Sequence, residues 1–214
     1  MSAMTTRVAW GRRLRWASAL ALVAATAGAV AAQERVIAQT GGGDGLWVLR
    51  RSAGSDVVEG AGARSRLPEE VGSYALAAVD GGWLVTGTRD DGQGRHEMAL
   101  VSGAAGLAVR TRSGPAAIEA IQASPQPVVD GGELVGLVWL EGAGRGELGV
   151  RVADHGPGGF SAAQWLSAPG GRSQLAPEVA VLADGSWLVV WSAVLDGDED
   201  IVYSLRQGGA WSAP

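Results

Sequence analysis

The chain has 214 residues, of which 17 are basic and 22 acidic, so its formal net charge is −5. A negative chain is a poor candidate for binding nucleic acid or an anionic membrane surface, because both attract basic patches. There is no cysteine, which excludes a disulfide framework and leaves packing as the source of stability.

Residues 1–31 are predicted to be a cleaved secretory signal, followed by the mature chain at 32–214. Four arginines precede an uncharged, alanine-rich run at 17–32, and Ala29-Val30-Ala31 has the small-x-small pattern of a signal-peptidase site. The alternative is an uncleaved anchor, but the run is shorter than the roughly 20 residues that span a bilayer. We expect an exported, periplasmic or secreted protein without a membrane span after cleavage. Loss of the leader's four arginines would lower the net charge from −5 to −9. The general and the twin-arginine export routes both stay open.

An Asp-Gly pair between two apolar runs occurs three times in the next part of the chain. The segments are 77–85, 127–135 and 181–189, and their turn residues Asp80, Asp130 and Asp184 lie 50 and 54 residues apart. A shorter copy has its turn at Asp44. Such a pair predicts a β-hairpin with a type I′ turn, in which both central residues have positive φ.

Each copy continues in the same way beyond its hairpin. An acid- and glycine-rich loop leads to a third strand with period-two alternation, as at 148–153 and 201–206, and a short fourth element follows a glycine turn. Four-stranded units at this spacing are typical of β-propeller blades. We predict an all-β, propeller-type repeat of about four antiparallel blades, partial or open, at 35–70, 73–122, 125–172 and 175–214. The tryptophans of the second strands are expected to pack between blades.

Three arrangements of these blades stay open at this point. The chain is a piece of a longer propeller, a four-bladed ring, or an open arc that another chain completes. An open arc would expose strand edges and apolar faces, which predicts self-association through the open blade edges.

The last copy resembles the blades of the sialidase-like (BNR or Asp-box repeat) β-propellers. Their hallmark is Ser-x-Asp-x-Gly-x-x-Trp, and Ser204, Gly208 and Trp211 are in register with it, but Arg206 stands where the Asp belongs. A second degraded box is present at Asp154, Gly156 and Phe160. The resemblance implies that these residues are structural. It also implies a substrate site of three arginines, a Tyr–Glu pair and an Asp, and this set cannot be assigned in the sequence.

The predicted ligand contacts are arginines in or beside the loops that follow the second strands, because such loops surround the ligand face of propellers. They are Arg89, Arg95 and Arg145. We predict no catalytic residue, no cofactor and no metal. The alternative is a Ca²⁺ site at Asp196, Asp198 and Asp200. It is not an EF-hand, because Ile201 and Gln207 occupy the positions that need Gly and Glu.

Together these features predict an exported, non-enzymatic binding or interaction module with a carbohydrate or protein ligand. The alternative is a glycoside hydrolase of exo-sialidase type whose catalytic residues lie mostly outside this chain. The fold alone does not decide between them, because propellers host many functions.

Overall fold

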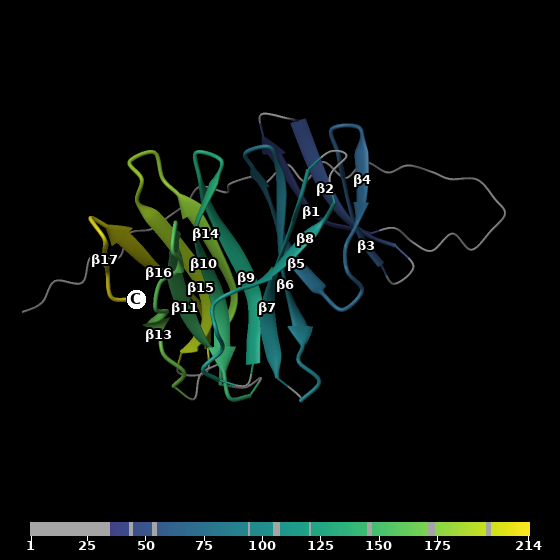
Figure 1. The fold of residues 1–214 in the computed structure, drawn as a ribbon. Helices are drawn as coiled ribbons and strands as arrows, with labels where there is room; N and C mark the ends of the chain where they lie inside the picture. The colour runs from purple at the N-terminus through teal and green to yellow at the C-terminus, as the bar shows by residue number, and fades with distance from the viewer. Residues whose placement is uncertain are drawn as a thin grey trace, which may run out of the picture. The chain divides into compact units, whose positions relative to one another are not determined.

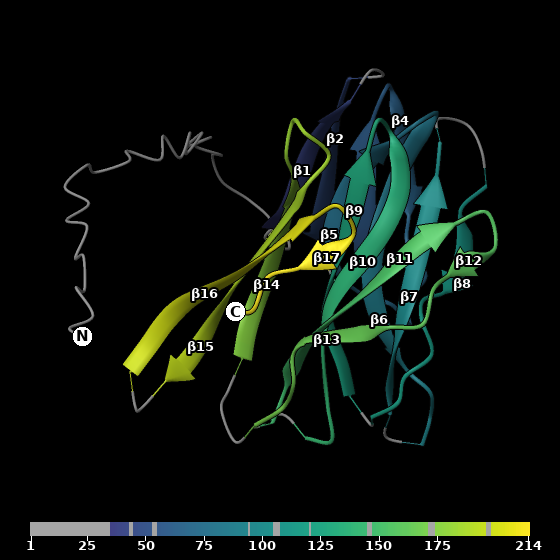
Figure 2. The same cartoon turned by 90° about the vertical axis from the view of Figure 1, so that its left-hand side faces the viewer.

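Antiparallel β-strands form the regular structure of the chain in the computed structural model (Figures 1 and 2). The structure describes residues 35–42, 45–52, 55–93, 95–104, 108–119, 121–144, 147–170, 174–195 and 198–214. These ranges contain no helix, and so none that is long and apolar enough to cross a membrane. The all-β prediction is confirmed. The predicted signal segment, residues 1–31, lies outside the described residues.

Four successive groups of strands make up the described part of the chain. The first blade contains β1 (Arg35–Gly42), β2 (Gly45–Ser52), β3 (Ser55–Gly60) and β4 (Ala63–Arg66). The second blade contains β5 (Gly72–Val79), β6 (Gly82–Asp90), β7 (His96–Gly103) and β8 (Arg110–Ser113). The third contains β9 (Ile121–Asp130), β10 (Glu133–Gly142) and β11 (Gly149–Gly156), and its fourth strand has two parts, β12 (Gly159–Phe160) and β13 (Gln164–Ser167). The fourth contains β14 (Gln174–Val181), β15 (Trp187–Leu195), β16 (Asp198–Gln207) and β17 (Ala210–Trp211).

Within each blade the strands pair with one another antiparallel and in chain order. The second and third blades are also linked by one parallel bridge, between His96 and Ile121. The chain therefore has the predicted propeller-type repeat of four-stranded antiparallel blades.

The first strands of the blades lie side by side: β1 contacts β5, β5 contacts β9, and β9 contacts β14. A shift in pairing register shows that each of them carries a β-bulge, at Ile37, Tyr74, Ser124-Pro125 and Ala176-Pro177. A bulge bends its strand and redirects the side chains beyond it. Because the pairing pattern recurs, residues of different blades can be equated by the partners that they face across the sheet.

The Asp-Gly pairs do not form the predicted type I′ turns; in the second copy the two turn residues with positive φ are Gly131 and Gly132, one position later. Asp80, Asp130 and Asp184 do not have positive φ, so the prediction that both residues of each Asp-Gly pair would have it is wrong. In the third copy the Asp184 carboxylate instead accepts a hydrogen bond from the Ser186 N–H at 3.0 Å, and Gly185 alone has positive φ. This local hydrogen bond offers aspartate an alternative to the left-handed conformation. The hairpin loop predicted at Asp44 lies outside the described residues.

Three apolar clusters fill the spaces between successive blades. One contains Trp47 and Trp83, the second contains Leu100 and Trp139, and the third contains Trp187 together with residues of β10, β11 and β15. The exposed fraction of Trp47, Trp83, Trp187 and Trp191 is at most 6%. The prediction that these second-strand tryptophans pack between blades is confirmed.

The residue that departs from the Asp-box pattern ties two blades together. The Arg206 guanidinium donates to both carboxylate oxygens of Asp154, at 2.5 and 3.0 Å, across the boundary between the third and fourth blades. It also lies over the Trp187 ring, 4.7 Å from the ring centre. The hairpin itself is held by serine: Ser212 Oγ accepts from the Leu205 N–H at 3.0 Å, and Ser161 in the third blade does the same for Asp154.

Candidate binding cavity between the third and fourth blades

A buried carboxylate organises the boundary between the second and third blades. Glu141 on β10 has no exposed surface. Its Oε1 accepts from Arg151 Nη1 at 2.9 Å, and its Oε2 accepts from Trp139 Nε1 at 2.8 Å and from Gln122 Nε2 at 3.2 Å. Two backbone N–H groups, of Ile118 and Glu119, complete the set at 2.9 and 3.1 Å. Every oxygen lone pair that burial removes from water thus has a partner.

The hydrogen bonds determine the ionisation of this carboxyl. Burial acts to raise the pKa of Glu141, but the hydrogen bonds from Trp139, Ile118 and Gln122 outweigh burial and leave the pKa below its usual value. The carboxylate is therefore charged at neutral pH and paired with Arg151, whose side chain is 3% exposed. This cluster is structural, because every oxygen of the carboxylate is paired; Arg151 Nε is its one buried polar atom without a partner among the described residues.

The fourth blade keeps half of this cluster and lacks the charged half. Across the third blade Gln122 faces Glu141 and Trp139 faces Arg151. At the equivalent pairs of the fourth blade Gln174 faces Ala193 and Trp191 faces Val202. The amide and the indole are thus retained, while small apolar residues replace the carboxylate and the guanidinium.

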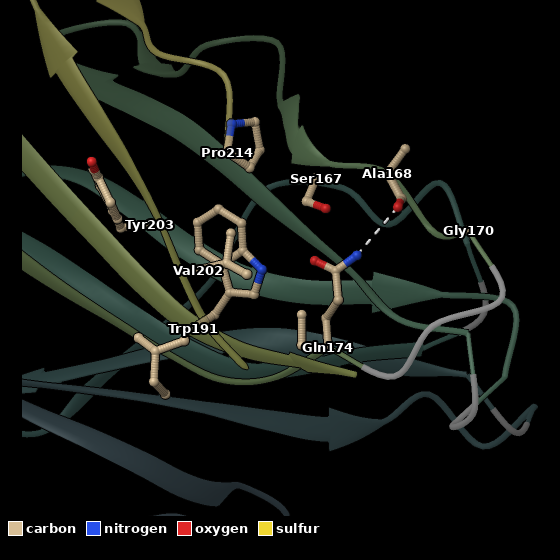
Figure 3. Close-up of a pocket in the computed structure, with 10 residues that line it drawn as sticks. Ser167, Ala168, Gly170, Gln174, Trp191, Val202, Tyr203 and Pro214 are labelled. Atoms are coloured by element: carbon tan, nitrogen blue, oxygen red, sulfur yellow. Dashed lines mark hydrogen bonds between the residues drawn. The ribbon is translucent and has the colours of Figure 1, made fainter. Parts of the chain in front are cut away.

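A cavity of about 590 Å³ lies at this place (Figure 3). Its lining includes Gln174, Trp191 and Ala193, joined by Ser167 of the third blade and by Tyr203 of β16; the other lining residues are Ala168, Gly170, Ile201, Val202 and Pro214. None of these ten residues carries a charged side chain. Tyr203 is 60% exposed, so its ring is available at the surface of the cavity.

Two buried polar atoms in the cavity wall have no hydrogen-bond partner among the described residues. They are the indole Nε1 of Trp191 and the amide Oε1 of Gln174, on side chains of residues that are 2% and 3% exposed. The other end of the Gln174 amide donates to the Ala168 carbonyl at 3.2 Å, which fixes its orientation (Figure 3). Ala193 explains the unpaired indole, because it stands where Glu141 accepts the Trp139 N–H.

These atoms define what the cavity can bind. An unpaired buried donor or acceptor costs about 1–3 kcal/mol. A hydroxyl group can accept from the indole N–H and donate to the amide oxygen, because it carries both a proton and lone pairs. Neutral walls, an aromatic ring and one donor beside one acceptor suit an uncharged ligand that carries hydroxyl groups.

The structure places two of the predicted arginines, Arg89 and Arg95, outside the lining of this cavity. Arg89 Nη2 donates to Ser113 Oγ at 3.2 Å and lies 3.7 Å from the Glu97 carboxylate. Arg95 Nη2 lies 3.5 Å from the Glu119 carbonyl oxygen. Arg89 thus links three strands of the second blade, and Arg95 lies beside the segment that leads to the third; the role of both in ligand binding stays a prediction. Arg145 lies outside the described residues.

The Ca²⁺ alternative also stays a prediction. Asp198 and Asp200 are exposed on β16, and Asp196 lies outside the described residues. Within the described ranges, no group of three or more His, Asp or Glu side chains is placed to hold a metal ion.

Reasoning from the sequence missed Gln174, Ala193 and the polar end of Trp191. The signal was present, because Val138-Trp139 and Val190-Trp191 align in the second strands, and Glu141 then aligns with Ala193. The change from a charged residue to a small one at an otherwise retained position marks the cavity.

No protein-family model matches the chain, and no curated protein matches it in sequence. Solved structures are similar to it in fold. An endo-arabinase from Bacteroides thetaiotaomicron is 10% identical with a TM-score of 0.54, and the match covers 77% of this chain and 72% of that one. A thermostable family-43 glycoside hydrolase is 13% identical with a TM-score of 0.56, and the match covers 84% of this chain and 72% of that one.

A puromycin-hydrolysing peptidase from Mycobacterium tuberculosis is also similar, with 16% identity and a TM-score of 0.53. The match covers 84% of this chain but only 30% of the peptidase. At these identities the likeness concerns the fold. It defines the class of protein: a β-propeller arrangement that is shared with glycoside hydrolases.

Proposed function

We propose that the chain binds neutral carbohydrate in the cavity between its third and fourth blades. The observation that carries this proposal is the pair of unpartnered buried atoms, Trp191 Nε1 and Gln174 Oε1, in a wall whose described residues carry no charged side chain. A sugar hydroxyl can accept from the indole N–H and donate to the amide oxygen. Two of the similar folds belong to glycoside hydrolases, which supports a carbohydrate ligand over a protein ligand.

The same observation argues against a sialic acid ligand. Recognition of a carboxylate calls for arginine or lysine, and no lining residue supplies either among the described residues, which leave out 171–173 between the lining residues Gly170 and Gln174. Binding should therefore favour neutral oligosaccharides. A glycan array that contains matched neutral and sialylated oligosaccharides tests this, followed by titration calorimetry of the best binder. Binding that is confined to sialylated glycans, or none at all, would contradict the proposal.

A second candidate function is hydrolysis of a glycosidic bond, with Glu178 as the proton donor. Glu178 lies on β14, one residue after the bulge at Ala176-Pro177; it is solvent-exposed, and partial burial shifts the pKa of its carboxyl upward. It has no hydrogen-bond or ion-pair partner among the described residues. A glycosidase needs a carboxylic acid that stays protonated near neutral pH to protonate the leaving oxygen. The similar folds favour this hydrolase-related reading over a module without enzymatic activity.

The enzymatic reading is tested with neutral aryl glycosides as substrates. Turnover that Glu178→Gln abolishes and Glu147→Gln leaves unchanged supports Glu178 as the acid, since Glu147 is an exposed carboxylate of the third blade. Turnover of aryl arabinosides or other neutral glycosides that survives Glu178→Gln excludes this role.

Export of the chain is part of the same proposal. The arginine-rich start, the uncharged run and the small-x-small site at Ala29-Val30-Ala31 support cleavage near residue 31. Mass spectrometry of the protein recovered from a periplasmic fraction of a bacterial host measures its N-terminus, which we expect at Ala32.

A further inference from the structure

The fourth blade exposes apolar side chains at positions that the third blade buries completely. Ile201 faces Ser192 across the fourth blade, as Val150 faces Leu140 across the third, so the two positions are equivalent. Tyr203 is equivalent to Val152 in the same way. Val150 and Val152 are at most 1% exposed, because the fourth blade covers them. Ile201 and Tyr203 are 75% and 60% exposed. The outer face of the fourth blade is thus an uncovered copy of a face that elsewhere receives the next blade.

The first blade also has uncovered apolar side chains, on the face that points away from the second blade. Pairing across the first two strands equates Leu46 with Trp83 and Val48 with Val85. Trp83 and Val85 have no exposed surface, because they pack against the first blade. Leu46 is 57% exposed and Val48 is half-buried. No described blade precedes the first one to cover them.

These two faces are complementary halves of one kind of contact. Inside the chain, the Val150 and Val152 side of one blade packs against the Trp187 and Trp191 side of the following blade. The outer face of the fourth blade corresponds to the first half of such a contact. The outer face of the first blade corresponds to the second half. Figure 1 shows the first and fourth blades at opposite ends of the row of described sheets.

The charges of the two blades are also complementary. The described residues of the first blade, 35–42, 45–52 and 55–70, include five arginines and four carboxylates, a net charge of +1. The described residues of the fourth blade, 174–195 and 198–214, include one arginine and five carboxylates, a net charge of −4. Opposite charges on the two surfaces favour their association and oppose the pairing of like blades.

We propose that a second copy of this chain is the partner of the uncovered faces, with the fourth blade of one copy docked head to tail on the first blade of the next. The contact is heterologous, because the two surfaces come from different blades. Burial of Ile201, Tyr203 and Leu46 and electrostatic attraction between the two blades would both stabilise this contact. Leu46 and Val48 do not line the cavity, whereas Ile201 and Tyr203 do, so the first-blade variant tests association without touching the sugar site.

Two variants, each of which introduces a charge on one of the two faces, test the docking proposal on the full chain. Leu46→Asp places an acid on the first-blade face opposite the acidic fourth blade, and Ile201→Arg places a cation on the fourth-blade face opposite the basic first blade. Both residues are more than half exposed, so the monomer should fold, which circular dichroism checks. Ile118→Arg is the matched control, because Ile118 is 67% exposed in the second blade and lies on neither face.

Sedimentation velocity over a range of concentrations provides the measurement. We expect the wild type and Ile118→Arg to associate, and each face variant alone to stay monomeric. An equimolar mixture of Leu46→Asp and Ile201→Arg should form a one-to-one complex, because each variant keeps the face that the other has lost. Raising the salt concentration from 0.05 to 0.5 M should weaken wild-type association by about tenfold.

Three results would overturn the proposal: a monomeric wild type at all concentrations, association of either face variant alone, or a mixture that stays monomeric. Sugar binding by Leu46→Asp separates the two proposals, since this variant should lose association and keep the ligand. A wild type that associates but binds no neutral sugar would instead leave head-to-tail docking standing and contradict the sugar site.

Discussion

Restoring the missing charged pair in the fourth blade should close the cavity and satisfy the unpaired indole. In the double variant Ala193→Glu/Val202→Arg, the new carboxylate stands where Glu141 stands in the third blade. The Trp191 N–H then has an acceptor, and the new guanidinium faces Trp191 as Arg151 faces Trp139. The cavity of about 590 Å³ provides room for both side chains.

The magnitude follows from the groups involved. Satisfying the indole N–H recovers about 1–3 kcal/mol, against which the ion pair loses part of its hydration. We therefore expect the double variant to be as stable as the wild type or up to about 2 kcal/mol more stable. Ala193→Glu alone leaves an unpaired carboxylate in the cavity and should be the least stable form, with a coupling energy between the two substitutions of at least about 2 kcal/mol.

Urea denaturation of the wild type, the two single variants and the double variant measures this coupling. Titration with the neutral oligosaccharide from the array then asks whether the filled cavity still binds. A coupling energy near zero would refute the equivalence of the two clusters. Undiminished sugar binding by the double variant would refute the cavity as the site.

Glu141→Gln should lower the free energy of unfolding by about 3–5 kcal/mol in urea, because it leaves Arg151 buried without its charged partner, whereas Glu147→Gln should have no effect. Because the pKa of Glu141 is lowered in the fold, its stabilising contribution is complete above the pKa of an unfolded glutamate, about 4.3, and is lost as the pH falls further through the folded pKa. Acid titration of thermal stability should therefore be less steep in Glu141→Gln. Arg206→Lys should lower the unfolding free energy by about 1 kcal/mol, since a lysine cannot hold both oxygens of the half-exposed Asp154, and the loss should shrink in high salt. Gly136→Ala should lower the melting temperature, because its Cβ would lie 2.4 Å from a buried tryptophan ring and 2.8 Å from a backbone oxygen, at a cost of about 1–3 kcal/mol.

Much of the fold could be predicted from the sequence because the same pattern of turn residues and alternating apolar residues recurs in several copies. The Asp-Gly hairpins locate the first two strands of each blade, and the alternation at 148–153 and 201–206 locates the third. The turn type could not be predicted from the pair alone. The Asp184 side chain bonds to the Ser186 N–H, and that local competition decides the backbone conformation.

The candidate site was harder to predict, because it arises where a small side chain leaves the Trp191 indole without the carboxylate that its counterpart has. Ala193 is an ordinary strand residue until its register shows that it faces Gln174 beside Trp191. Arg89 and Arg95 were predicted from loop position, which says nothing about their neighbours, and the structure gives each a partner in its own blade. Partner contacts of this kind follow from tertiary packing and cannot be read from spacing.

The central claim is that the cavity wall, through the Trp191 indole N–H, binds a neutral sugar. Two-dimensional NMR of the chain with its nine tryptophans labelled at Nε1 measures this directly during titration with the neutral oligosaccharide. We expect one indole resonance, absent from Trp191→Phe, to shift and saturate, and to stay unchanged in Ala193→Glu/Val202→Arg. An unmoved Trp191 resonance at saturating sugar would contradict the account.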